Sequence, residues 1–138
     1  RAWSLYLVVS RNQNLGVDRV VRGEAALADW IPVYSLVSGL LPADVITSNY
    51  PTFSNSRGLY AATRFESARG GAVTFTLKGV VKDAWLNGVS VKTAEQFSAV
   101  ARAGTNTLVL QLDEKNLGDG VRLSAGDVTF LNDSFSSL

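Results

Sequence analysis

AVTFTLKGVVKDAWLNGVSV (residues 72–91) and AGTNTLVLQLD (residues 103–113) are the two strings that decide the fold of this chain. Apolar and polar side chains alternate in both, which is the pattern of a strand with one buried face. Leu108, Leu110 and Leu112 share such a face. Asn87-Gly88 supplies the two residues with positive φ that a type I′ hairpin needs. This segment therefore predicts three or four short antiparallel strands.

Working outward, the rest of the chain offers more short strands than helices. We expect further strands at residues 3–9, 17–22, 59–66, 121–123 and 128–131. Residues 24–30 (EAALADW), which are rich in alanine and end before Pro32, are the best helical candidate. About eight to ten strands with at most one short helix predict an all-β fold, an antiparallel β-sandwich (jelly roll), with residues 1–138 as a single domain.

Composition excludes several function classes. The 138 residues are 46% hydrophobic, enough for a core without a metal or disulfide. The 13 basic and 12 acidic side chains give a net charge of +1, which offers no basis for a nucleic-acid partner. Cys and His are absent, so thiolate or imidazole metal sites and a Ser-His-Asp triad are excluded. No apolar run approaches the roughly 20 residues of a membrane span.

Two motifs in the opening segment resemble the galactose-binding-like β-sandwich superfamily, and most closely the sugar-binding domain that precedes the catalytic barrel of many glycoside hydrolases. In that family a strand ends in a V-x-NG-x-x-V hairpin, which residues 84–91 match, and a later turn reads G-x-N-x-L-x-V-x-V, which residues 104–112 match. The resemblance covers Gly71 to Asp113, about a third of the chain. It implies the jelly-roll fold, but the matched residues are structural and transfer no binding site.

A second resemblance concerns the cellular context. Residues 29–34 (DWIPVY) and 37–42 (VSGLLP) are similar to accessory regions of large secreted multidomain proteins of planctomycete-type bacteria, some of which carry haem or dehydrogenase modules. No CxxCH motif is present, so a haem role would belong to a neighbouring domain. Together with the absence of Met, this resemblance implies a piece of a larger bacterial protein that is secreted or periplasmic.

The polar segment at residues 48–58 (SNYPTFSNSRG) is the strongest candidate for a binding site. Loops at one end of a rigid sandwich commonly carry function, and a sugar-binding loop combines a stacking aromatic ring with amide or guanidinium donors. The candidate ligand-binding residues are Asn49, Tyr50, Phe53, Asn55 and Arg57. The alternative is that both aromatic rings anchor the loop while the polar side chains face water.

Three other features are weaker candidates. Packing is favoured over a ligand platform for Trp30 and Tyr34, whereas alternation places Trp85 on the outer face of its sheet, as a platform or an interdomain contact. Residues 113–120 (DEKNLGDG) offer oxygen ligands for a structural Ca²⁺, but their spacing does not match a calcium loop and Lys115 intrudes. An ordinary charged turn without a cofactor is favoured.

No catalytic motif is present, and the carboxylates form no recognisable acid–base pair. The sequence therefore predicts a non-catalytic carbohydrate-binding or accessory module of a larger secreted bacterial protein. The alternative is a structural or interaction domain that packs against an adjacent domain or subunit. A concave, polar-rimmed site would favour sugar, and a flat apolar patch around Trp85 would favour a protein partner.

Overall fold

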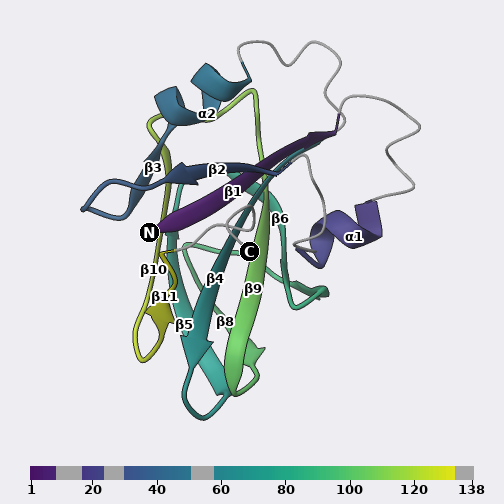
Figure 1. Cartoon of the computed structure of the whole chain (residues 1–138), viewed down its shortest axis with the longest axis vertical. Coiled ribbons are helices and arrows are strands. Elements are labelled where there is room, and N and C mark those ends of the chain that lie inside the picture. Colours follow the sequence, from purple (N-terminus) through teal and green to yellow (C-terminus); the bar gives the residue numbers. More distant parts are fainter. Residues whose placement is uncertain (9–16, 24–29, 51–57, 133–138) are drawn as a thin grey trace.

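The computed structural model describes residues 1–8, 17–23, 30–50 and 58–132, which form eleven strands and two short helices (Figure 1). The strands are β1 (Ala2–Val8), β2 (Ile31–Tyr34), β3 (Leu40–Pro42), β4 (Gly58–Ser67), β5 (Gly71–Lys78), β6 (Val81–Leu86), β7 (Val89–Val91), β8 (Gln96–Ala101), β9 (Gly104–Leu112), β10 (Gly120–Ala125) and β11 (Thr129–Phe130). The helices are α1 (Val17–Val21) and α2 (Ala43–Asn49).

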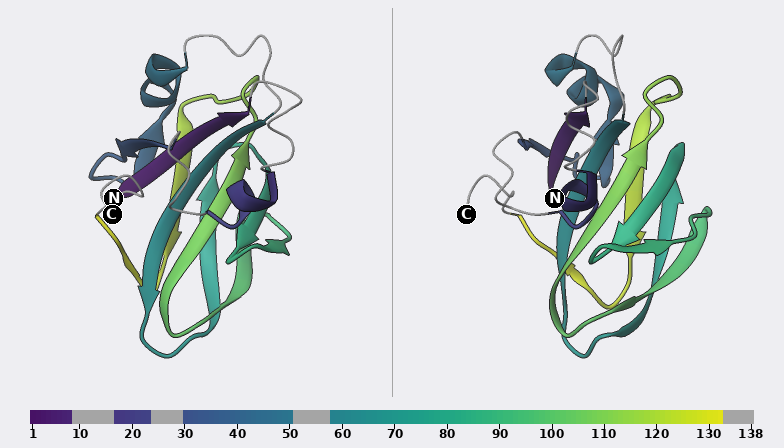
Figure 2. Two further views of the ribbon diagram at one scale, coloured as in Figure 1. Left: turned by 45° about the vertical axis from the view of Figure 1, so that its right-hand side comes forward. Right: turned by 90° about the vertical axis from the view of Figure 1, so that its right-hand side faces the viewer.

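The strands form two sheets that pack face to face (Figure 2). The first sheet has the order β2-β1-β4-β9-β6-β7, and β11 pairs with the part of β4 beyond the end of β1. The second sheet has the order β3-β10-β5-β8. Every pairing is antiparallel, which confirms the predicted all-β sandwich.

The core lies between the inner faces of the two sheets. Phe65 of the first sheet meets Phe75 of the second edge to face, with ring centroids 5.7 Å apart, and Phe75 stacks on Phe97 at 5.2 Å. The row Leu108, Leu110 and Leu112 is fully buried, as its alternation predicts. The chain has no cysteine, so these apolar contacts, and not disulfides, hold the two sheets together.

A second apolar cluster covers the outer face of the first sheet. We call it the outer cluster; its buried members are Tyr6, Val8, Val20, Trp30, Tyr60, Ala62 and Val109. The Trp30 ring lies 5.5 Å from that of Tyr6, so the predicted packing of Trp30 is confirmed, whereas Tyr34 is 57% exposed. Trp85 faces outward as predicted, but it is half-buried beside Tyr60, with ring centroids 6.2 Å apart.

The Asn-Gly hairpin between β6 and β7 is confirmed. Asn87 and Gly88 have φ angles of 52° and 82°, the positive values that a type I′ turn requires. The Asn87 side chain donates to Oδ1 of Asn106 and accepts a hydrogen bond from the Thr107 backbone, each at 2.9 Å. The two motifs that carry the family resemblance are therefore joined to each other by hydrogen bonds.

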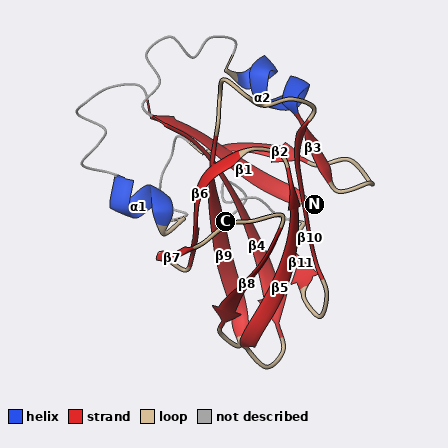
Figure 3. Ribbon diagram, turned by 180° about the vertical axis from the view of Figure 1, so that it is seen from behind, coloured by secondary structure: helices blue, strands red, loops and turns tan. Residues whose placement is uncertain are grey.

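The helices differ from the sequence prediction. Residues 17–22 were predicted as a strand, but α1 occupies this position and packs Val20 and Val21 on the outer cluster. The predicted helix at residues 24–30 lies outside the described residues except for Trp30. Figure 3 shows both helices at the periphery of the strands. No helix of the described residues is long and apolar enough to cross a membrane.

The helix α2 was not predicted. It begins directly after Pro42, whose φ of −68° suits a helix N-terminus, and it buries Ile46 in the core. The Ala43 N–H donates to the Asp119 carbonyl at 3.0 Å, which attaches the helix to the residues before β10. The segment predicted as a polar loop from residue 48 therefore begins inside a helix.

Candidate functional site

The structure describes two of the five predicted binding residues. Asn49 is the last residue of α2, and its amide Nδ2 donates to the Val45 carbonyl at 2.8 Å. Tyr50 follows, half-buried against the core, with its hydroxyl 3.5 Å from the Leu5 carbonyl oxygen. Phe53, Asn55 and Arg57 lie outside the described residues. Of the two alternatives for Tyr50, these contacts favour the ring as an anchor for the end of α2.

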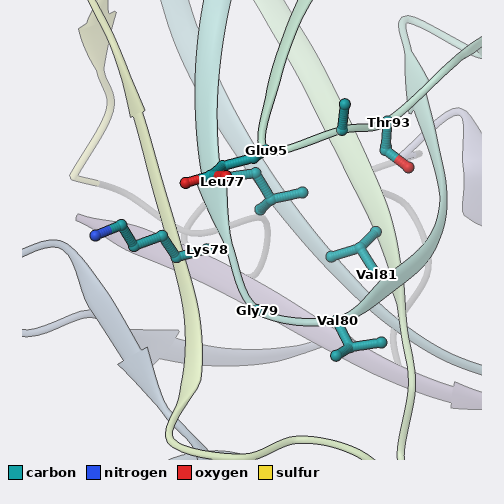
Figure 4. Close-up of a pocket in the computed structure, with 8 residues that line it drawn as sticks. Leu77, Lys78, Gly79, Val80, Val81, Thr93 and Glu95 are labelled. Atoms are coloured by element: carbon teal, nitrogen blue, oxygen red, sulfur yellow. The ribbon is translucent and has the colours of Figure 1, made fainter.

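A hollow of about 550 Å³ lies at the same end of the sandwich (Figure 4). It is lined by Leu77–Val81 of the β5–β6 turn and by residues 93–95 before β8. Val80 and Val81 lie on one side, and Thr93 and Glu95 lie on the other (Figure 4). The Leu77 N–H donates to the Glu95 carbonyl at 2.7 Å and joins the two sides.

A second hollow, of about 380 Å³, adjoins the first and shares Lys78, Gly79 and Val80 with it. Its remaining lining comes from the β2–β3 turn, the residues before β10, and β10 itself: Ser38, Leu40, residues 116–120 and Arg122. The β5–β6 turn thus stands between two hollows. Gly79 in this turn has a φ of 118°, and a Cβ there would come 2.6 Å from the Gly120 carbonyl oxygen. Only glycine therefore fits at this position of the turn.

The rims of the two hollows are polar and partly charged. Lys78 and Arg122 are exposed and occupy directly opposite positions of β5 and β10. Glu95 lines the first hollow and Asp119 the second, so the described lining of each contains one carboxylate. The apolar surface comes from Val80, which is 49% exposed, with Val81 and Leu117. The arrangement offers hydrogen bonds, charge and an apolar surface.

The loop between β9 and β10 uses its acidic oxygens to hold its own shape. Asp113 accepts hydrogen bonds from Nδ2 of Asn116 at 2.9 Å and from the Lys115 N–H at 3.1 Å. The hydrogen bond from Asn116, followed by that from Lys115, lowers the pKa of the Asp113 carboxyl. Glu114 pairs with Lys82 at 3.3 Å. In the part of the chain that the structure describes, no group of three or more acidic side chains could hold a metal ion.

The outer cluster contains a tyrosine with a shifted pKa, Tyr60. Burial raises the pKa of Tyr60, and the charges of Asp83 and Glu114 raise it further. Tyr60, Gln111 and Asp83 form one cross-strand row on the outer face of the first sheet. Trp85 packs into this cluster. Among the described residues, the exposed large apolar side chains lie elsewhere: Tyr34, Leu36 and Val37 at the end of β2 and the β2–β3 turn, Val80 in the β5–β6 turn, Val89 in β7 and Val100 in β8.

Comparison with protein-family models, curated proteins and solved structures gave no match. The resemblance to the galactose-binding-like superfamily therefore rests on residues 84–91 and 104–112 alone. Function has to be argued from the chemistry of the site.

Sequence reasoning missed Lys78, Val80 and Arg122 as site residues. Alternation in β5 places Lys78 on the outer face, so this position could be predicted from the sequence. Its pairing with Arg122 could not be predicted, because β5 and β10 are far apart in the chain and their register depends on the whole sheet. The exposed Gly79-Val80 turn was a local signal that could have drawn attention to this end.

Proposed function

We propose that this chain is a non-catalytic carbohydrate-binding module of a larger secreted protein and that saccharide binds at the sandwich end around the β5–β6 turn. The observation that carries the proposal is the pair of adjoining hollows divided by Val80. A sugar ring has an apolar face and a rim of hydroxyl groups, so it is suited to an apolar surface bordered by hydrogen-bonding side chains. Ser38, Thr93 and Asn116 supply such groups here.

The walls of the hollows are held in place by backbone hydrogen bonds. Besides the bond between Leu77 and Glu95, the Asp113 N–H donates to the Val80 carbonyl at 3.4 Å. The Gly120 N–H donates to the Leu117 carbonyl at 2.8 Å. A site with preformed walls loses little conformational entropy on binding, which supports recognition by turns of a rigid sandwich.

The described ends of the segment predicted from the sequence lie at this end of the sandwich. Gly58 begins β4, and the next residue, Leu59, lies opposite Leu112, which in turn pairs with Val81 at the start of β6. Tyr50 follows α2, which packs on β3 and β10. Both described flanks of residues 51–57 therefore lie at the end of the sandwich that carries the hollows. Phe53, Asn55 and Arg57 stay candidates for contacts with the same ligand.

The test is a calorimetric screen of soluble polysaccharides with the wild type and Val80→Ala. Removing the exposed apolar side chain should weaken binding by about tenfold, because about two methyl-sized groups lose their contact with the sugar. Val100→Ala is the matched control, since Val100 is an exposed valine on β8 that lines neither hollow. Absence of saccharide binding, or equal weakening by both variants, would contradict the proposal.

A second function, packing against an adjacent domain or subunit, is favoured by one observation. At the β2–β3 turn Tyr34 is 57% and Leu36 54% exposed, and Val37 is fully exposed. Apolar side chains gathered on a turn are typical of a contact surface. The test is to produce the chain together with its flanking coding sequence and compare backbone hydrogen exchange at residues 34–37 with that of the isolated chain. Slower exchange in the longer product supports this function, and equal exchange contradicts it.

A further inference from the structure

Two like charges face each other on the open side of the second sheet. Lys78 and Arg122 are directly opposite residues of β5 and β10, with their side chains on the outer face. No described helix lies over this face, because α1 packs on the first sheet and α2 buries Ile46 at the end of the core (Figure 2). Like charges at opposite positions of an antiparallel pair destabilise a sheet.

No ion pair joins Lys78 or Arg122 to an acidic side chain of the described residues. Glu95 and Asp119 line the hollows on either side, yet neither forms an ion pair with Lys78 or Arg122 within the described ranges. By contrast, Lys82, one strand further along the chain, pairs with Glu114 at 3.3 Å. Lys78 and Arg122 therefore face each other without an ion-pair partner among the described residues.

The β2–β3 turn holds Arg122 beside the second hollow. Gly39 has a φ of 89°, and a Cβ there would come 3.9 Å from both Cγ and Nε of Arg122. The stem of the arginine thus lies along the turn, and Arg122 belongs to the lining that also includes Ser38 and Asn116. A guanidinium can donate two parallel hydrogen bonds to a carboxylate or sulfate, and a neighbouring ammonium adds a second charge.

Hydroxyl and amide side chains continue the same face away from the cations. Thr76 lies opposite Ser124 on one side and Gln96 on the other, and the hydroxyl oxygens of Thr74 and Ser98 are 3.1 Å apart. An anion held by Lys78 and Arg122 would therefore have hydrogen-bonding groups along the next rows of the sheet. These groups could bond the hydroxyls of an acidic sugar and of its neighbours in a longer polysaccharide.

We propose that this face binds an acidic saccharide, a glycan carrying carboxylate or sulfate groups, with one anionic group between Lys78 and Arg122. The inference rests on the proposed carbohydrate-binding function and narrows its ligand class. An anion bound between the two cations offsets their repulsion. The stability that this repulsion costs the free protein is therefore regained in the complex.

The binding test compares polygalacturonate with its methyl ester, and carrageenan with unsulfated galactan, against wild type, Lys78→Gln, Arg122→Gln and Arg69→Gln. The control Arg69 is exposed between β4 and β5, at the opposite end of β5 from Lys78. We expect an acidic polymer to bind at least tenfold more tightly than its neutral counterpart. Lys78→Gln and Arg122→Gln should each lose about tenfold, added salt should weaken binding, and Arg69→Gln should match wild type.

The two acidic polymers distinguish the sources of the anion, since the first carries only carboxylates and the second only sulfates. Equal binding of neutral and acidic polymers would overturn the acidic-saccharide proposal while leaving the carbohydrate-binding function intact. So would an acidic polymer whose affinity is unchanged in Lys78→Gln and Arg122→Gln. Absence of binding by all four polymers would overturn the acidic-saccharide proposal, and absence of binding throughout the polysaccharide screen would overturn the carbohydrate-binding function as well.

A second measurement needs no ligand. Because Lys78→Gln removes one of two facing charges, it should raise the melting temperature of the free protein in low salt by roughly 1–4 °C. The gain should shrink in high salt, where repulsion is screened. Arg69→Gln should leave the melting temperature unchanged. A lower melting temperature for Lys78→Gln would contradict the repulsion on which the proposal depends.

Discussion

Asn106 shows at the scale of one residue how the sandwich holds a turn and a hairpin together. Its side chain is fully buried and makes four hydrogen bonds. Oδ1 accepts from Nδ2 of Asn87 and from the Arg102 N–H, each at 2.9 Å. Nδ2 donates to the carbonyls of Arg102 at 2.9 Å and Gly104 at 3.0 Å. Replacing this amide leaves several buried polar groups without partners.

We therefore expect Asn106→Ala to lower the free energy of unfolding by about 2–4 kcal/mol, measured by urea denaturation. Asn106→Asp should fail to rescue it, because a carboxylate cannot donate to the two carbonyls. The control is Asn116→Ala, which removes an exposed amide bonded to Asp113 and should cost less than about 1 kcal/mol. Similar losses for the alanine variants would show that burial of Asn106 contributes nothing.

Tyr60 gives the protein a pH dependence at the alkaline end. Because its pKa is raised by burial and by Asp83 and Glu114, the folded protein keeps the phenolic proton where the unfolded chain has lost it. The free energy of unfolding should therefore fall as the pH rises above about 10, the ordinary pKa of tyrosine. Tyr60→Phe should reduce this fall in denaturation measured across that range. Tyr34→Phe, which alters an exposed ring, should keep the wild-type slope; the reverse result would contradict the assignment.

At the scale of the element, the hairpin between β6 and β7 has little tolerance for change. Gly88 has a φ of 82°, and a Cβ there would come 2.7 Å from Cγ of Arg22, just after α1. Gly88→Ala should lower the free energy of unfolding by about 1–3 kcal/mol in chemical denaturation, because backbone strain and steric contact add. Gly126→Ala is the control, since a Cβ at Gly126 meets nothing within 4 Å and its φ is not positive. A neutral Gly88→Ala would mean that the turn can adopt another type.

The elements that sequence predicts correctly are those with local causes. Asn87-Gly88 requires positive φ whatever surrounds it, and the row from Leu108 to Leu112 alternates over a whole strand. The strand predicted at residues 17–22, where α1 lies, was wrong. Val20 and Val21 favour strands intrinsically, but here they pack on the outer cluster from a helix. The helix α2 was missed because it is short and depends on the non-local bond from Ala43 to Asp119.

The candidate site divides in the same way. The sequence identified Asn49 and Tyr50 by residue type, but type does not reveal that the Tyr50 ring packs against the core. Lys78 and Arg122 form a pair only through the register of β5 with β10, which no local pattern encodes. The sequence could indicate a candidate site near one end of the sandwich, whereas the facing charges there could not be predicted.

At the scale of the whole molecule, Arg1 joins the two sheets. Arg1 directly precedes β1 of the first sheet, and its Nη1 donates to the Leu123 carbonyl of β10 in the second sheet. The guanidinium carbon also lies 3.6 Å from the ring centroid of Phe130 in β11. Nearby, the Leu131 carbonyl accepts from the Ala2 N–H at 3.3 Å, and the Leu131 N–H donates to the Arg64 carbonyl at 2.9 Å. One half-buried cation thus links β1, β10 and β11.

A double-mutant cycle of Arg1→Ala and Phe130→Leu measures this link. Arg1→Ala should lower the free energy of unfolding by about 1–3 kcal/mol, since it removes a charge-assisted hydrogen bond and a cation–π contact. Phe130→Leu keeps an apolar side chain beside Phe65, whose ring centroid lies 5.9 Å away, but removes the π face. The coupling in chemical denaturation should be about 0.5–1 kcal/mol. Losses that add within about 0.3 kcal/mol would show that the cation acts on Leu123 alone, and that β11 is held by its strand pairing and by Phe65.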